Sequence, residues 1–234
     1  IPYHYLDLFS EEYKYLNSLI YLAKLKLVKY QLKPFRGQSI LDLGCGDGRM
    51  CYELKDENLD LLGIDLEENA ILFARAFSPN VKFKIEDIYK MKLNKKFDAI
   101  ILLDVLEHLY PKEIPKVLKI IKENLTEKGK LIITVPTKNL ELHKKHYQHF
   151  DDNLMVKTLM PYFKVKKSLG YSRTGFKNMI FSFLKWIGLL FYVFRYKFKI
   201  IYKYYEFLEN FCMNNLALGK ADNSFFMLVV AEKV

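Results

Sequence analysis

Three glycines within five residues follow an apolar run in the segment ILDLGCGDGR (residues 40–49). A core strand does not need them, because glycine weakens a strand and packs nothing. Glycine does let the backbone come close to another group, because it has no Cβ. The segment therefore predicts a strand that ends at Gly44, a loop that holds a ligand against its main chain, and a helix that begins near Arg49.

The same alternation of strand and helix continues along the chain. Apolar, strand-like segments lie at 39–44, 59–65, 81–87, 97–104 and 129–137, and helix-like segments lie between them at 49–58, 67–77 and 112–125. Continuous apolar strands that alternate with helices indicate a parallel sheet covered on both faces. Asp65, Asp87 and Asp104 each end one of these strands, at the sheet edge where such folds bind ligands.

The charges around the glycine loop indicate the kind of ligand. The spacing is G-x-G-x-G rather than the G-x-G-x-x-G of dinucleotide enzymes, and Asp42 and Asp47 flank the loop. Carboxylates beside a phosphate would repel it. A ligand with a sulfonium and an ammonium is favoured over a pyrophosphate. Asp65, at the end of the next strand, is placed to accept both hydroxyls of a ribose.

Four segments together resemble the class I S-adenosylmethionine-dependent methyltransferases: ILDLGCGDGR, GID (63–65), IED (85–87) and FDAIILLDVLEHL (97–109). The resemblance covers about residues 36–172. It implies an α/β, Rossmann-like methyltransferase fold with a doubly wound, seven-stranded and mostly parallel sheet. It also implies S-adenosylmethionine as the cofactor.

By this resemblance, the glycine loop lines the cofactor, Asp65 binds its ribose, and Asp87 and Ile88 flank its adenine. Leu103 and Asp104 lie near its methionine portion. The full set of expected cofactor-binding residues is Asp42, Gly44, Cys45, Gly46, Gly48, Asp65, Leu66, Asp87, Ile88 and Leu103.

Histidines concentrate on the expected acceptor side, in DVLEHL (104–109) and ELHKKHYQHF (141–150). We take His108, His146 and Asp104 as candidate catalytic residues, with a histidine as the base that an oxygen acceptor requires. A pocket-shaping role remains open. So does a divalent-metal role, since Asp104, Glu107, His108 and His146 loosely resemble the ligand set of small-RNA 2′-O-methyltransferases. No residue is assigned as a metal ligand.

The region before the last strand is unusual. Segments 164–172 and 224–234 resemble the sixth and seventh strands, which a short hairpin commonly joins in this family. Here residues 176–211 lie between them and are rich in aromatic and basic side chains. They predict either a lid over the substrate pocket or a helix on an anionic membrane surface. The longest uncharged run there, 186–194, is too short to span a bilayer.

Four parts of the chain follow from these patterns. They are an N-terminal helical segment (1–35), an S-adenosylmethionine-binding core (36–172), an inserted helical cap (173–223) and a final core strand (224–234). Within the first segment, Ser10, Glu11 and Glu12 predict the start of a helix that keeps helical spacing to Pro34.

The formal net charge of +10 favours a negatively charged partner such as nucleic acid, an anionic membrane or an acidic substrate. Nucleic acid ranks lower, because the basic residues accompany a strongly apolar helix. Three cysteines without metal-ligand spacing indicate a reducing cytoplasm, with membrane association left open. We expect methyl transfer to a small-molecule or lipid-linked acceptor, at oxygen. The alternatives are a metal-dependent RNA 2′-O-methyltransferase and a non-catalytic binding module.

Overall fold

The structure is a computed structural model of the 234-residue chain. It describes residues 2–9, 19–91, 93–174 and 219–234, and between the last two ranges also 179, 180, 182–184, 186, 187, 203, 207 and 210. The expected helix start at Ser10 and most of the expected cap at 176–211 lie outside the described residues. The division into core and cap stays a prediction.

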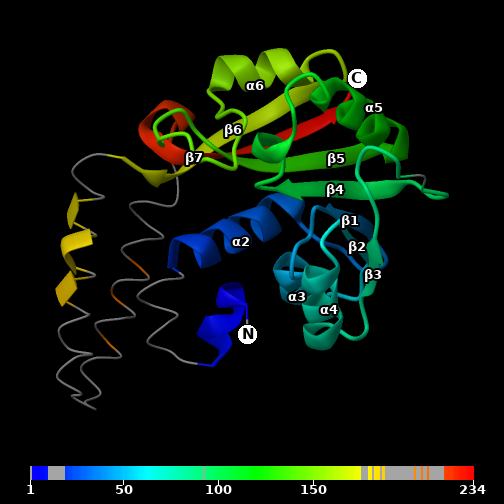
Figure 1. Cartoon of the computed structure of the whole chain (residues 1–234), viewed down its shortest axis with the longest axis horizontal. Coiled ribbons are helices and arrows are strands. Elements are labelled where there is room, and N and C mark those ends of the chain that lie inside the picture. Colours follow the sequence, from blue (N-terminus) through cyan, green and yellow to red (C-terminus); the bar gives the residue numbers. More distant parts are fainter. Residues whose placement is uncertain are drawn as a thin grey trace.

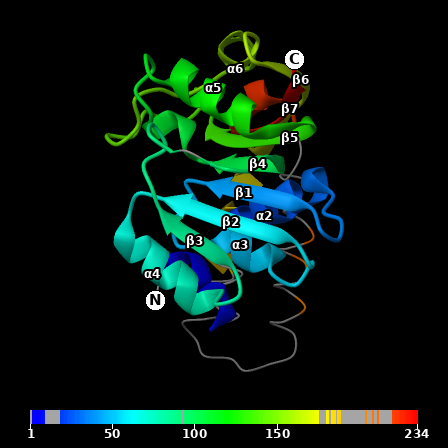
Figure 2. The same cartoon turned by 90° about the vertical axis from the view of Figure 1, so that its right-hand side faces the viewer.

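Seven strands form one sheet in the order β3-β2-β1-β4-β5-β7-β6 (Figure 1). The strands are β1 (Ser39–Leu43), β2 (Asp60–Asp65), β3 (Lys82–Ile85), β4 (Phe97–Leu103), β5 (Leu125–Pro136), β6 (Phe163–Arg173) and β7 (Ser224–Lys233). The first five pair in parallel, and β7 runs antiparallel between β5 and β6. Figure 2 shows the strands stacked from β6 to β3. The predicted fold class is confirmed.

The helices follow the strands in the predicted alternation. The helical elements are η1 (Tyr3–Leu8), α2 (Leu19–Leu32), α3 (Arg49–Leu54), α4 (Glu68–Phe77), η2 (Leu106–His108), α5 (Ile114–Asn124), α6 (Asp152–Leu159) and η3 (Ala221–Asn223). The short helix η1 was not predicted, and β5 begins earlier than the predicted segment 129–137. No helix among the described residues is both long and apolar enough to span a membrane.

Alternating side chains of the strands build a core on each face of the sheet. Leu41 and Leu43 join one cluster with residues of α5 and α6, whereas Ile40 joins the other with residues of α2 and α3. Successive strand residues point to opposite faces. Asp42 therefore lies on the face of α3, where Cys51 contacts it. The sheet brings this carboxyl group into the protein interior beside the glycine loop.

Candidate active site

The glycine loop after β1 turns across the end of β2. The backbone N–H groups of Gly44 and Cys45 donate to the carbonyl oxygen of Ile64, at 2.8 and 3.0 Å. Gly44 and Gly46 have φ angles of +78° and +53°, in the left-handed region that favours glycine. A Cβ on Gly44 would lie 2.5 Å from a methyl carbon of Val105, whereas one on Gly46 would meet no heavy atom within 4 Å. The main chain at Gly46 is therefore open to a ligand.

Asp65, at the end of β2, is fixed by the backbone around it. Its Oδ2 accepts a hydrogen bond from the N–H of Gly46 at 2.7 Å, and its Oδ1 accepts from the N–H of Glu67 at 2.9 Å. Each carboxylate oxygen can accept a second hydrogen bond. The carboxylate is thus held in place and can still bind the two hydroxyls of a ribose.

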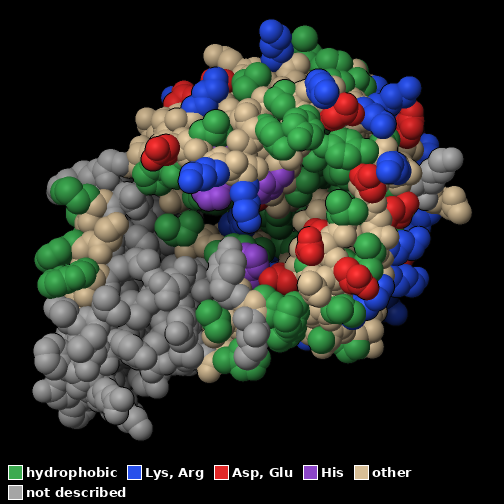
Figure 3. Space-filling view, in the orientation of Figure 1, with side chains coloured by type: hydrophobic (Ala, Val, Ile, Leu, Met, Phe, Trp, Pro, Cys, Tyr) green, Lys and Arg blue, Asp and Glu red, His purple; other side chains and the backbone are tan. Residues whose placement is uncertain are grey.

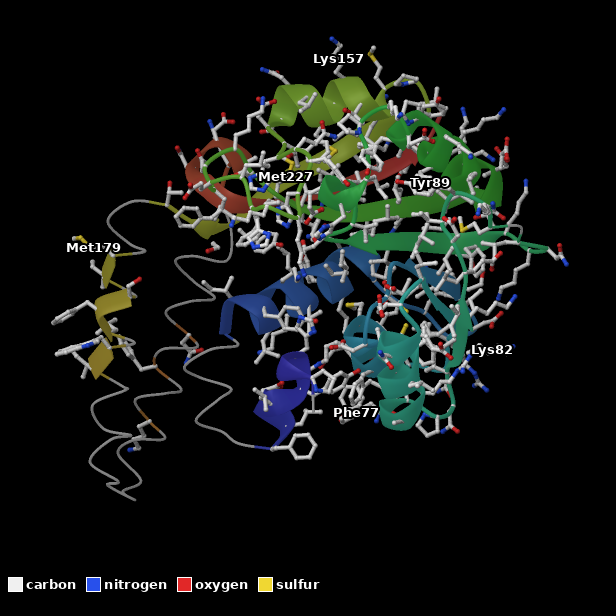
Figure 4. The ribbon with its side chains drawn as sticks, in the orientation of Figure 1. Phe77, Lys82, Tyr89, Lys157, Met179 and Met227 are labelled. Atoms are coloured by element: carbon white, nitrogen blue, oxygen red, sulfur yellow. The ribbon has the colours of Figure 1, made fainter. Side chains whose placement is uncertain are left out.

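A cavity of about 400 Å³ opens at the carboxyl ends of the parallel strands. Five of the expected cofactor-binding residues line it: Gly44, Asp65, Leu66, Asp87 and Ile88. Three tyrosines that the sequence reasoning missed also line it: Tyr89 (labelled in Figure 4), Tyr110 and Tyr147. Their flat rings suit an adenine. The sequence signal that could have identified them is an aromatic residue in the segment that follows a strand.

A second cavity of about 290 Å³ adjoins the first, and the two share Gly44, Asp104 and His108. Four more expected cofactor-binding residues line it: Asp42, Cys45, Gly46 and Leu103. Figure 3 shows histidine side chains around a hollow in the same face of the molecule. An elongated ligand can therefore place its nucleoside in the first cavity and a charged chain in the second.

Asp42 contributes a buried carboxyl group to the wall of this second cavity. It is 3 % exposed, its Oδ2 accepts from the Cys51 thiol at 3.5 Å, and its Oδ1 has no hydrogen-bond partner among the described residues. Burial, together with the charges of Asp65 and Asp47, raises the pKa of Asp42 to about 7. A cationic ligand would stabilise the ionised carboxylate. The residues present therefore fit the ammonium and sulfonium of S-adenosylmethionine.

Gly48 has a packing role, and the cofactor-binding role expected for it stays a prediction. A Cβ there would lie 2.7 Å from the Cβ of Ala74 and 3.1 Å from the ring of Phe83. The absence of a side chain lets α3 begin directly against α4 and β3. Within the described part of the chain, the residues that line the two cavities do not include Gly48.

Asp104, directly after β4, is joined to a lysine that the sequence reasoning missed. Lys24 of α2 is 7 % exposed, and its Nζ lies 2.5 Å from Asp104 Oδ2. The Thr134 hydroxyl donates to Asp104 Oδ1 at 2.7 Å. Burial favours the neutral acid, yet the Lys24 ammonium and these hydrogen bonds hold the pKa of Asp104 below its ordinary value. Asp104 is therefore an ionised carboxylate. Each of its two oxygens accepts a hydrogen bond, and the residue lines both cavities.

The N-terminal segment closes the site from a second side. His4 Nδ1 lies 2.7 Å from Asp47 Oδ2, and the Tyr5 hydroxyl donates to the carbonyl oxygen of Asp47 at 2.9 Å. Arg49, which is buried, forms an ion pair with Asp7 at 2.6 Å. These contacts give Asp47 a structural partner and place η1 against the glycine loop.

The fold brings the candidate residue His146, from the segment after β5, to Glu107 and the candidate residue His108, which follow β4. The two histidine rings are T-shaped with centroids 4.7 Å apart, and one ligand atom of each of the three residues lies within 4.8 Å of the others. Burial and the charge of Asp104 raise the pKa of Glu107 to about 8. Burial and the neighbouring histidines lower the pKa of His146. The cluster is therefore able to accept a proton or to bind a cation.

Comparisons with known proteins agree with this geometry. A family model described as a methyltransferase domain matches residues 34–177. Cyclopropane-fatty-acyl-phospholipid synthase of Escherichia coli is 30% identical over 127 residues, which are 52% of this chain and 32% of that protein. Ubiquinone biosynthesis O-methyltransferase of Coxiella burnetii is 29% identical over 96 residues, which are 39% of this chain and 41% of that protein.

A solved structure shows the same fold. Magnesium protoporphyrin IX methyltransferase from Synechocystis PCC 6803, with bound S-adenosylmethionine, has a TM-score of 0.59 at 17% identity and covers 92% of this chain and 81% of that one. The chain spans about a third to two fifths of the length of the two curated relatives named above. The site's residues and the matched family agree on S-adenosylmethionine as the cofactor.

Proposed function

The chain belongs to the methyltransferase domain family, and on that premise we propose that it transfers a methyl group from S-adenosylmethionine to an oxygen atom of a small-molecule or lipid-linked acceptor. One observation carries the proposal. The two cavities that fit the cofactor meet at Asp104 and His108, and His108 belongs to a cluster of proton-accepting side chains.

When bound, S-adenosylmethionine supplies a methyl group on a sulfonium sulfur, which leaves as a neutral thioether. The chain's own residues bind the cofactor and orient it. Asp65 and the open main chain at Gly46 hold the nucleoside end, and Asp42 lies where the ammonium is expected. Holding donor and acceptor in line supplies much of the rate enhancement of such a transfer.

On the acceptor side, an ion pair determines the charge that an incoming acceptor meets. Because Lys24 neutralises Asp104, the site does not present an uncompensated carboxylate to an incoming hydroxyl. We assign His108 and His146 to the activation of that hydroxyl, which must lose its proton as the new bond to carbon forms. Nitrogen acceptors need such activation less, which supports oxygen as the acceptor atom.

A third cavity, of about 350 Å³, supports a ring-containing or lipid-linked acceptor. It shares Lys24 and Asp104 with the second cavity. Its aromatic walls include Tyr171 and Phe226, whose rings stack with centroids 5.3 Å apart. Both curated relatives are named for lipid or quinone chemistry, which agrees with this class of acceptor.

The test supplies the protein with methyl-labelled S-adenosylmethionine and with lipid, small-molecule and RNA fractions from cells that lack it. The expected result is label in the lipid or small-molecule fraction, with mass spectrometry placing the methyl group on oxygen. Asp65→Ala serves as the negative control. Label in RNA would favour the RNA 2′-O-methyltransferase, and cofactor binding without any transfer would favour the non-catalytic module.

An anionic membrane remains part of the proposal as a partner. Met179, Phe183 and Trp186 are 61%, 61% and 57% exposed at helical spacing, which suits an apolar face on a membrane better than a packed lid. Met179 lies at the margin of the molecule (Figure 4).

Sedimentation with phospholipid vesicles tests this partner. We expect stronger binding to anionic than to neutral vesicles, and Gln at Arg195, Lys197, Lys199 and Lys203 should remove the difference while leaving cofactor affinity intact. Equal, negligible binding to both vesicle types would favour the lid.

A further inference from the structure

We propose that Glu107, His108 and His146 form a binding site for one divalent transition-metal ion beside the point of methyl transfer. The proposal departs from the sequence-based expectation of no metal ligand. It deepens the proposed function, since a cation there would activate the acceptor hydroxyl. The metal site itself can be tested without turnover, so its failure is distinct from failure of methyl transfer.

Hydrogen bonds fix the tautomer of His146. His149 Nδ1 lies 3.2 Å from the carbonyl oxygen of Leu140, which can only accept, so this nitrogen carries a proton. In the neutral ring, His149 Nε2 is then an acceptor. His146 Nδ1 lies 2.8 Å from it and donates. His146 Nε2 is therefore left with a free lone pair.

His108 is arranged in the same way. Its Nδ1 lies 3.1 Å from the carbonyl oxygen of Lys145 and must donate to it. Its Nε2 is left as the nitrogen with the lone pair. Metal-binding histidines characteristically donate their other ring N–H to a carbonyl or a further side chain, which orients the ring. Both histidines meet this condition before any ion is bound.

Glu107 supplies the oxygen ligand. It is 1% exposed, and its Oε2 is buried without a hydrogen-bond partner among the described residues. A buried carboxyl oxygen normally has a partner, because leaving it unpaired is unfavourable. One ligand atom of Glu107 lies within 4.8 Å of those of both histidines.

The structure removes Asp104 from the four-residue set suggested by the sequence. Both of its oxygens are engaged, one by Lys24 and the other by Thr134. Two imidazole nitrogens and one carboxylate remain. This set suits zinc, manganese, iron or cobalt better than magnesium, which prefers oxygen ligands. Three protein ligands also leave coordination positions open, as in catalytic metal sites.

The proposed site borders the cofactor cavities through His108. Of the three proposed ligands, His108 alone lines both cavities, so the ion would meet an acceptor from the His108 side. Such an ion would lower the pKa of an acceptor hydroxyl and so ease the loss of its proton. The two histidines would then act on the acceptor through the ion.

The test titrates the full chain, freed of metal by chelator and dialysed, with Co²⁺ alone and with Mn²⁺ alone. Calorimetry and the visible absorption of Co²⁺ report binding. We expect one ion per chain, with affinity reduced at least tenfold in both Glu107→Gln and His146→Ala. His149→Phe, which removes the hydrogen bond that orients His146, should weaken binding by a smaller factor.

His143→Ala is the matched control, because His143 is an exposed histidine of the same loop and is not part of the proposed set. It should bind Co²⁺ as the unaltered protein does. Cofactor affinity and thermal unfolding show whether each variant is folded. The proposal is overturned if the unaltered protein binds neither Co²⁺ nor Mn²⁺ when the ion is supplied at a concentration on the order of 100 micromolar. It is also overturned if Glu107→Gln binds normally or if His143→Ala abolishes binding.

Discussion

The cofactor side and the acceptor side of this site are built in different ways. On the cofactor side, the main chain makes a key contact: the N–H of Gly46 donates a hydrogen bond to the carboxylate of Asp65, 19 residues away in the sequence. On the acceptor side, side chains make them, and Lys24 reaches Asp104 across 80 residues of sequence. The first side depends on backbone shape, and the second on which side chains the fold brings together.

This difference indicates how each side responds to substitution. A side built on a glycine loop that holds one carboxylate should respond to substitution mainly through its affinity for the cofactor. The acceptor side is built on an ion pair between a buried lysine and a carboxylate that is 33% exposed. It is sensitive to the loss of one partner, because the remaining charge is left largely shielded from water. Substitutions on the two sides test this contrast.

Lys24→Met should have the largest effect, lowering the free energy of unfolding by about 3–5 kcal/mol near pH 8, because ionised Asp104 loses its partner. In this variant burial favours the neutral acid, so the loss should shrink as the pH falls toward 4. Denaturant unfolding at several pH values measures it. Lys26→Met, exposed on the same helix, should change stability by only about 0.5 kcal/mol.

The double variant Lys24→Met, Asp104→Asn removes both charges and so leaves no unpaired charge behind. It should recover much of the lost stability. If the single variant loses the same amount at every pH, or if the double variant recovers nothing, the ion pair does not hold the acceptor side together.

Asp42→Asn tests the buried carboxyl group on the cofactor side. The unfolded Asp42 loses its proton near its ordinary pKa, and the folded one near pH 7. Between these values the folded state binds more protons, so the unaltered protein loses stability as the pH rises. Relative to it, Asp42→Asn should gain up to about 4 kcal/mol between pH 4 and pH 8. Parallel stability profiles would show that Asp42 titrates normally.

Asp65→Ala should weaken S-adenosylmethionine binding by roughly 1.5–3 kcal/mol, because the hydrogen bonds of a charged group to both ribose hydroxyls are lost. Titration calorimetry measures this affinity. Glu67→Ala is the matched control, since only the backbone of Glu67 contacts Asp65. Unchanged affinity in Asp65→Ala would remove Asp65 from the site.

Gly46→Ala should have the smallest effect on stability, about 1–2 kcal/mol for a non-glycine residue in the left-handed region. Cofactor affinity should fall about tenfold, since the added methyl group enters the open side of the loop. Gly37→Ala has similar strain, with φ +80° and no atom within 4 Å, but lies before β1. A similar loss of cofactor affinity in both variants would show that strain rather than contact is responsible.

Much of the cofactor side could be predicted from the sequence. The glycine spacing and the acids at the strand ends are local signals, and the structure brings Gly44, Asp65 and Ile88 to one cavity. Gly48 shows the limit of such signals. Its place in the motif predicts a helix that begins close to the loop, but only the structure identifies the neighbours in α4 and β3 that require a glycine there.

The acceptor side was decided by tertiary structure. Helical spacing alone does not distinguish Tyr30, which is 68% exposed, from Lys24, which is 7% exposed. Nor does it show that His149 orients His146, or that Glu107 keeps an unpartnered oxygen. Periodicity determines backbone conformation, because it acts between near neighbours in the chain. The partner of a buried charge is determined by packing between distant segments, which no local pattern specifies.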